Sequence, residues 1–93
     1  MNNQQKARAQ PSRILVVDDD PAVRALLADF LRQQGYEVRT TSNGPAALTT
    51  LRVEPCDALL VDLQMPGMSG LELATMVRKT APQVPIALLT GHP

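Results

Sequence analysis

The sequence predicts one small α/β domain with an open, doubly wound parallel sheet, and three observations lead to this fold class. Four segments typical of strands alternate with three segments of helical periodicity. Two of the strand segments, within residues 14–17 and 58–61, are apolar throughout, as in parallel strands buried on both faces. The chain has 93 residues, enough for a single core. Such alternation implies right-handed βαβ units with helices on both faces of the sheet.

The first strand and the first helix have the clearest signals. Residues 14–17 form the strand, and Pro21 suits the first helical position, where its missing N–H needs no partner. Asp20, just before it, is expected to cap the helix, and Gly35 is expected to end it. The apolar residues of this helix follow the spacing of one face and are Val23, Leu26, Leu27, Phe30 and Leu31.

The remaining elements continue the alternation. The second strand is short and polar, so it is expected at a sheet edge. Ser69 and Glu72 fit a capping box at the start of the third helix. The expected spans are strands at 36–41, 57–62 and 84–90 and helices at 45–54 and 71–79.

Composition and charge exclude several classes of protein. Lys+Arg and Asp+Glu are both nine, so nothing favours a nucleic acid or an acidic membrane surface as partner. Cys56 is the only cysteine, which excludes an internal disulfide, and it is expected to be inert. Residues 1–12 form a polar tail, expected to be disordered, without the apolar segment of a secretory signal. No apolar run is long enough to span a membrane, so the cytoplasm is the expected compartment.

Acidic residues follow two of the predicted strands. Asp18 and Asp19 end the first strand, Asp62 ends the third, and Thr90 ends the fourth. Because ligands of open parallel sheets gather at the carboxyl ends of the strands, these residues are expected to converge. Clustered carboxylates suit Mg²⁺, which leaves room for a phosphoryl oxygen. Asp62 is then a candidate nucleophile toward phosphorus, with Thr90 as a hydrogen-bond donor.

The segments ILVVDDDP, LLVDLQMPGMSG and PIALLTG resemble the three signature segments of receiver domains of two-component response regulators. The resemblance runs from residue 13 to residue 93 and implies a flavodoxin-like receiver fold. It also implies a signalling module that accepts a phosphoryl group from a sensor histidine kinase or a phosphotransfer protein, and that catalyses only its own phosphorylation and dephosphorylation.

The resemblance assigns a role to each matching residue. Asp62 matches the phosphoacceptor, and Asp62 and Asp19 match the direct Mg²⁺ ligands. Asp18 matches the acid that reaches the metal through water, and Gln64 matches the position whose backbone carbonyl completes the metal shell. Thr90 matches the switch hydroxyl. Four further positions match residues that shape the site or keep it open, namely Met65, Pro66, Gly67 and Gly91.

The sequence also departs from the family pattern. The last helix-strand-helix of the fold is absent from these 93 residues, and with it the site lysine, which neither Lys6 nor Lys79 matches. A partial chain of a longer regulator is therefore expected, in which phosphoryl transfer is slow or absent. The fourth strand becomes an open edge, and apolar faces of the sheet and first helix lose their cover, so a homodimer through that edge is expected.

Three other interpretations compete with the phosphoacceptor. An interaction or dimerisation fragment would keep the receiver fold without phosphorylation. A Mg²⁺-dependent phosphatase would need an acid two residues after its nucleophile, where this chain has Gln64. A dinucleotide-binding domain would need a G-x-G-x-x-G motif after the first strand, and none is present. His92 is expected to be an exposed loop residue without a ligand role.

Overall fold

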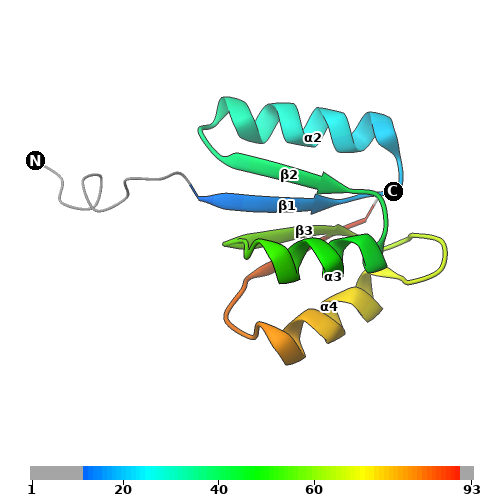
Figure 1. The fold of residues 1–93 in the computed structure, drawn as a ribbon. Helices are drawn as coiled ribbons and strands as arrows, with labels where there is room; N and C mark the ends of the chain where they lie inside the picture. Colours follow the sequence, from blue (N-terminus) through cyan, green and yellow to red (C-terminus); the bar gives the residue numbers. More distant parts are fainter. Residues whose placement is uncertain (1–11, 91–93) are drawn as a thin grey trace, which may run out of the picture.

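A computed structural model describes residues 12–90, which form a four-stranded parallel sheet with the strand order β2-β1-β3-β4. The predicted fold class is confirmed, and Figure 1 shows the strands running in one direction with their carboxyl ends at one edge. The elements are β1 (Arg13–Val17), α2 (Pro21–Gln33), β2 (Glu37–Thr41), α3 (Gly44–Val53), β3 (Ala58–Asp62), α4 (Gly70–Thr80) and β4 (Ile86–Leu89).

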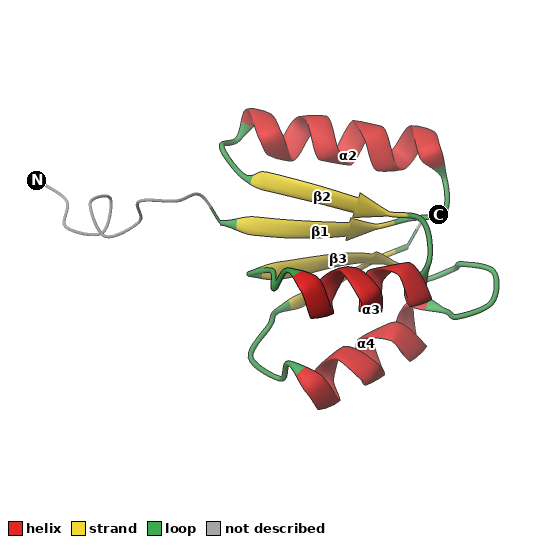
Figure 2. Ribbon diagram, in the orientation of Figure 1, coloured by secondary structure: helices red, strands yellow, loops and turns green. Residues whose placement is uncertain are grey.

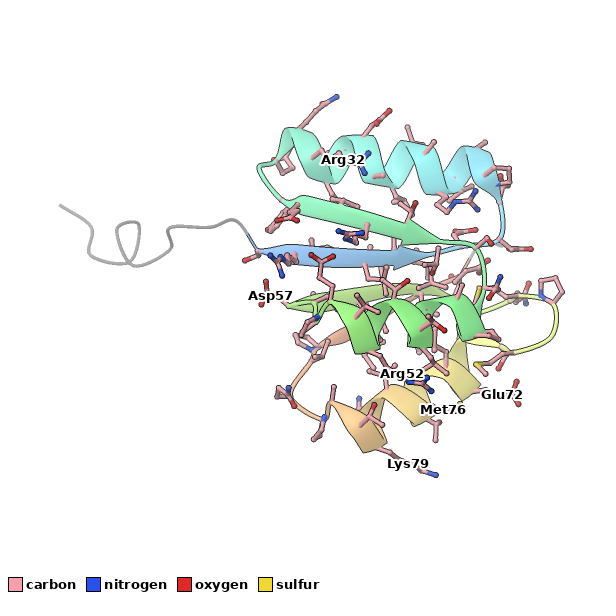
Figure 3. All side chains as sticks on the ribbon, viewed as in Figure 1. Arg32, Arg52, Asp57, Glu72, Met76 and Lys79 are labelled. Atoms are coloured by element: carbon pink, nitrogen blue, oxygen red, sulfur yellow. The ribbon has the colours of Figure 1, made fainter. Side chains whose placement is uncertain are left out.

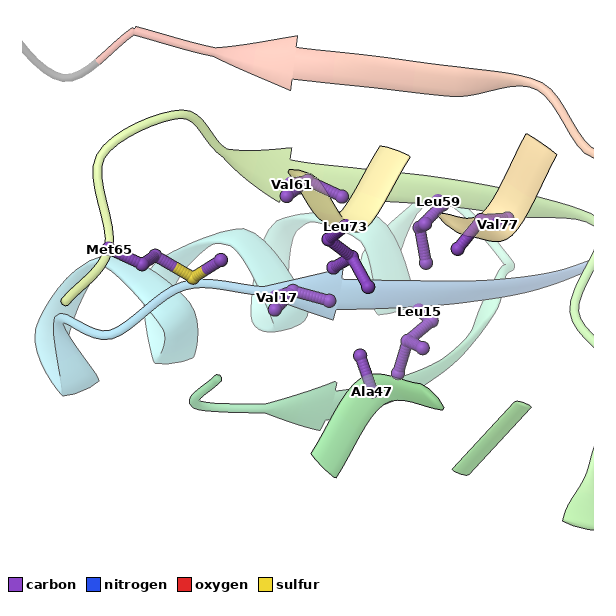
Figure 4. Packing of buried hydrophobic residues seen from close by; sticks show 8 residues of the cluster. All are labelled: Leu15, Val17, Ala47, Leu59, Val61, Met65, Leu73 and Val77. Atoms are coloured by element: carbon purple, nitrogen blue, oxygen red, sulfur yellow. The ribbon is translucent and has the colours of Figure 1, made fainter. Parts of the chain in front are cut away.

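The sheet is the middle layer of three. Figure 2 shows α2 on one face and α3 and α4 together on the other. The larger hydrophobic cluster lies under α3 and α4, and Figure 4 shows its buried members meeting from the sheet and both helices. A smaller cluster lies under α2, where Ala28 packs with Ile14, Val16 and Val38. The sheet is therefore doubly wound. β1 is buried on both faces, whereas β3 is buried under α3 and α4 and only partly buried on the α2 side, where Ala58 and Leu60 lie.

Side-chain caps fix where the helices begin, as the sequence predicts. Asp20 accepts hydrogen bonds from the N–H groups of Ala22 and Val23, at 2.9 and 3.4 Å. Ser69 and Glu72 form the capping box reciprocally, at 3.1 and 2.9 Å. Because the first helical turns leave their N–H groups without intrahelical partners, these contacts set the position at which each helix leaves its preceding loop.

Part of the surface of α2 is apolar and open to solvent. Leu26 is 70% exposed and Phe30 57%, although both belong to the predicted apolar face. Leu27 and Leu31 of the same face pack partly against the sheet. The apolar face of α2 is therefore wider than the part of the sheet beneath it.

The sheet edges and the boundaries are close to the expectation. β2 is an edge strand as predicted, and β4 is the other edge among residues 12–90. Ser12 belongs to the segment expected to be a tail, yet its carbonyl accepts a hydrogen bond from the N–H of Glu37 at 2.9 Å. Residues 1–11 of that segment lie outside the described part of the chain, so the expected disorder stays a prediction there. No helix within residues 12–90 is long and apolar enough to cross a membrane.

Candidate metal centre at the carboxyl edge of the sheet

Three carboxylates meet where β1 and β3 end. Asp18, Asp19 and Asp62 each offer one oxygen, and these oxygens all lie within 4.8 Å of one another. Asp18 is only 5% exposed, Asp62 is half-buried and Asp19 is exposed. The strands β1 and β3 are direct neighbours in the sheet, which is why acids 43 positions apart come together.

Two of these acids are oriented by the same kind of local hydrogen bond. Asp18 Oδ1 accepts from the N–H of Asp20 at 2.9 Å, and Asp62 Oδ1 accepts from the N–H of Gln64 at 3.1 Å. Each bond reaches two residues ahead, as in an Asx turn, and so fixes the carboxylate against its own loop. The N–H of Asp18 is held in turn by the carbonyl of Thr41 at 3.2 Å. Asp18 and Asp62 are therefore preorganised by backbone groups.

A hollow of about 490 Å³ opens beside the three acids. Gln64 and Thr90 line it from the loops after β3 and β4, and both are exposed. The structure thus brings together the five residues predicted as metal ligands, phosphoacceptor or switch hydroxyl, namely Asp18, Asp19, Asp62, Gln64 and Thr90, whereas Met65, Pro66 and Gly67 do not line the hollow. The remaining lining residues, which sequence reasoning did not select, are Asp20, Val23, Leu27 and Leu89. Gly91, predicted to keep the site open, and His92, predicted to be an exposed loop residue, lie outside the described residues, so both predictions stay untested.

The loop between β3 and α4 is anchored at several points. Met65 is 8% exposed and belongs to the larger cluster, where Figure 4 shows it beyond Val17 at the end of β1. Gly67 has φ +79°, a left-handed conformation that favours glycine. At the start of α4, the N–H of Gly70 donates to the carbonyl of Leu63 at 3.1 Å. These anchors fix the segment that carries Asp62 and Gln64, while Pro66 stays exposed.

The donor set fits a hard divalent cation. Three carboxylates this close repel one another, and a cation that binds all three removes that cost. Mg²⁺ prefers such oxygen ligands and combines one or two carboxylates with water. A soft metal would instead favour sulfur or imidazole ligands, and none of the residues within 12–90 that line this hollow offers one.

Sequence reasoning missed one charged residue of this edge. Arg24 is half-buried on α2, and its guanidinium donates a hydrogen bond to the backbone carbonyl of Asp18 at 2.8 Å. Its position held a usable signal, because a cation near a helix N-terminus opposes the helix dipole and needs compensation nearby. The partner observed is the backbone carbonyl of Asp18 in the preceding loop.

The fold and this site define a phosphoacceptor-type α/β module, and comparison with known proteins agrees. The model of the response regulator receiver domain matches residues 14–93. The chain therefore belongs to the response regulator receiver domain family.

Individual relatives support the assignment. The chain is 37% identical over 83 residues to the transcriptional regulatory protein GlrR of Escherichia coli, an alignment that covers 89% of this chain and 19% of GlrR. Among solved structures, it is similar to the response regulator TrrA of Thermotoga maritima in complex with Mg²⁺-BeF. That match has a TM-score of 0.84 and 44% identity and covers 87% of this chain and 70% of TrrA. The structure of TrrA in complex with the histidine kinase ThkA also matches, with a TM-score of 0.82 and 44% identity. This match covers 88% of this chain and 71% of the matched chain.

The chain thus spans about a fifth of GlrR's length. The response regulators among the relatives favour a receiver module, and they do not favour the alternative of an interaction fragment without phosphorylation.

Proposed function

We propose that Asp62 accepts a phosphoryl group from the phosphohistidine of a sensor histidine kinase or a phosphotransfer protein. The observation that carries this proposal is the convergence of Asp18, Asp19 and Asp62 on one hollow at the carboxyl edge of the sheet. Mg²⁺ would be held by these three carboxylates and by the backbone carbonyl of Gln64. When bound, the ion would supply positive charge that stabilises both the phosphoryl oxygens and the carboxylates.

The transfer itself needs only a few groups of this chain. The carboxylate of Asp62 attacks phosphorus, an O–P bond forms, and the N–P bond to the donor imidazole breaks. The imidazole nitrogen keeps the electron pair of that bond and takes up a proton. The N–H of Gln64 holds Asp62 Oδ1 in place, and the hydroxyl of Thr90, which lines the same hollow, donates to a phosphoryl oxygen. Loss of the phosphoryl group to water restores the free carboxylate.

A histidine kinase is proposed as the phosphoryl donor from the chemistry of the site and from one similar solved structure. TrrA was solved in complex with the histidine kinase ThkA, which supports a kinase as the partner of this chain. The module would catalyse its own phosphorylation and dephosphorylation in the cytoplasm and would turn over no external substrate. A homodimer through the open edge of β4 is a separate proposal, supported by the edge position of that strand among residues 12–90.

Phosphorylation by acetyl phosphate tests the proposed function. The 93-residue chain is incubated with and without Mg²⁺, and intact mass is measured beside Asp62→Asn. We expect a slow gain of one phosphoryl group that requires Mg²⁺ and is lost in the variant. A folded chain that gains no phosphoryl group under any condition would overturn the proposal and would restore the interaction fragment as the better explanation.

A further inference from the structure

Arg24 is the one basic side chain within residues 12–90 that lies at the acidic edge of the sheet. The helices run back from this edge, so residues in their last turns lie at the opposite end. Figure 3 shows Arg32 on α2 and Lys79 on α4, away from the loops that carry the acids. The other basic residues of the described part lie elsewhere. Arg13 is at the start of β1 and Arg39 lies within β2, and the last turns of the helices contain Arg32, Arg52, Arg78 and Lys79.

Several of those distant cations already have acidic or backbone partners. Arg13 pairs with Glu37 at 3.5 Å and with Glu54 at 3.7 Å, and Arg39 also pairs with Glu54. Arg32 donates to the carbonyl of Val38 at 2.9 Å. Among the residues described, Arg24 is therefore the basic side chain that contacts the acidic edge, and its partner there is a backbone carbonyl.

Within residues 12–90, Asp18 is held at three points, and Arg24 supplies the one that comes from the side chain of another element. Its N–H bonds to Thr41, its Oδ1 accepts from Asp20, and its carbonyl accepts from Arg24. The first two contacts fix the end of β1 and the carboxylate. The third contact connects the carbonyl of Asp18 to α2. This carbonyl belongs to the peptide bond that leads directly into Asp19.

We infer that Arg24 is a positioning residue of the metal centre, an inference that rests on the proposed function. Its guanidinium holds the carbonyl of Asp18, and so it fixes the turn from which the carboxylates of Asp18 and Asp19 approach Asp62. Removal of partners that orient metal ligands commonly weakens metal affinity by about 10- to 100-fold. A purely electrostatic role predicts the opposite sign, because loss of a nearby cation should tighten Mg²⁺ binding.

The test uses Arg24→Met, which keeps the apolar stem and removes the guanidinium. Arg32→Met is the matched control, because Arg32 lies on the same helix and donates to a carbonyl six residues away, as Arg24 does. Mg²⁺ affinity is measured by calorimetry on the 93-residue chain, without phosphodonor and under conditions where each variant is folded. We expect about tenfold weaker binding for Arg24→Met and unchanged binding for the control. Unchanged or tighter binding in Arg24→Met would overturn the inference.

A second readout separates this inference from the proposed function. Hydrogen exchange at the N–H of Asp20, which bonds to Asp18 Oδ1, is measured in EDTA. We expect faster exchange in Arg24→Met than in the wild type and the control, whether or not the chain binds Mg²⁺. Equal exchange in all three chains would contradict the inference. Absence of Mg²⁺ binding by the wild type would count against the proposed function instead.

Discussion

Substitution of Gly70 by alanine should disturb both stability and the metal centre. A Cβ at this position would lie 2.8 Å from Leu63 Cα and 2.9 Å from the carbonyl carbon of Asp62. The carbonyl oxygen of Asp62 would lie closer still, and ordinary contact begins at 3.4 Å, so the backbone must separate by at least about 0.6 Å. These neighbours are backbone atoms, which cannot rotate away as a flexible side chain can. We expect a loss of about 1 to 3 kcal/mol in the free energy of unfolding.

The same displacement reaches Asp62 directly, so weaker Mg²⁺ binding should accompany the loss of stability. Gly35→Ala is the matched control, because Gly35 has φ +98° and open space around it. Backbone strain there should cost about 1 kcal/mol or more without moving the acids. Urea unfolding and Mg²⁺ calorimetry are measured on both variants. A Gly70→Ala chain with wild-type stability and Mg²⁺ affinity would refute the reasoning.

Three further predictions concern the core, the thiol and the open edge. Leu59 is fully buried, so Leu59→Ala should cost about 2 to 5 kcal/mol by urea unfolding, and a loss below about 1 kcal/mol would contradict the packing. Burial raises the pKa of the Cys56 thiol, so alkylation at neutral pH should be slower in the folded chain than in the urea-unfolded chain, and it should accelerate as pH rises. Equal alkylation rates in the folded and unfolded chains would contradict this prediction. Sedimentation velocity should show concentration-dependent dimers through β4, and a compact monomer at the highest concentration would exclude them.

Much of the fold was predictable because local signals and the tertiary arrangement agree. Pro21 after Asp20 and the pair Ser69 and Glu72 specify helix starts by local hydrogen bonding, and the structure has those caps. The apolar run at residues 14–17 predicted a central strand, and the polar sequence of β2 predicted an edge. The meeting of the acids followed from the rule that parallel strands present their carboxyl ends together.

The contacts that sequence reasoning missed depend on tertiary approach. Gly70 lies one position before the expected start of the helix at residue 71, and only the structure brings the backbone of Asp62 against it. The position of Arg24 near a helix N-terminus is visible in the sequence, but its contact with the carbonyl of Asp18 arises only when α2 packs beside the end of β1. The hydrophobic pattern of α2 also could not distinguish Leu27, which packs partly against the sheet, from Leu26, which is exposed, because both lie on one broad apolar face.

The central claim is that Asp62, among four neighbouring acids, is the phosphoacceptor. Borohydride reduction of the chain phosphorylated with acetyl phosphate and Mg²⁺ converts an aspartyl phosphate into homoserine, and peptide mass mapping then locates it. The account predicts homoserine at position 62 alone. Homoserine at position 18, 19 or 20, with Asp62 intact, would contradict it.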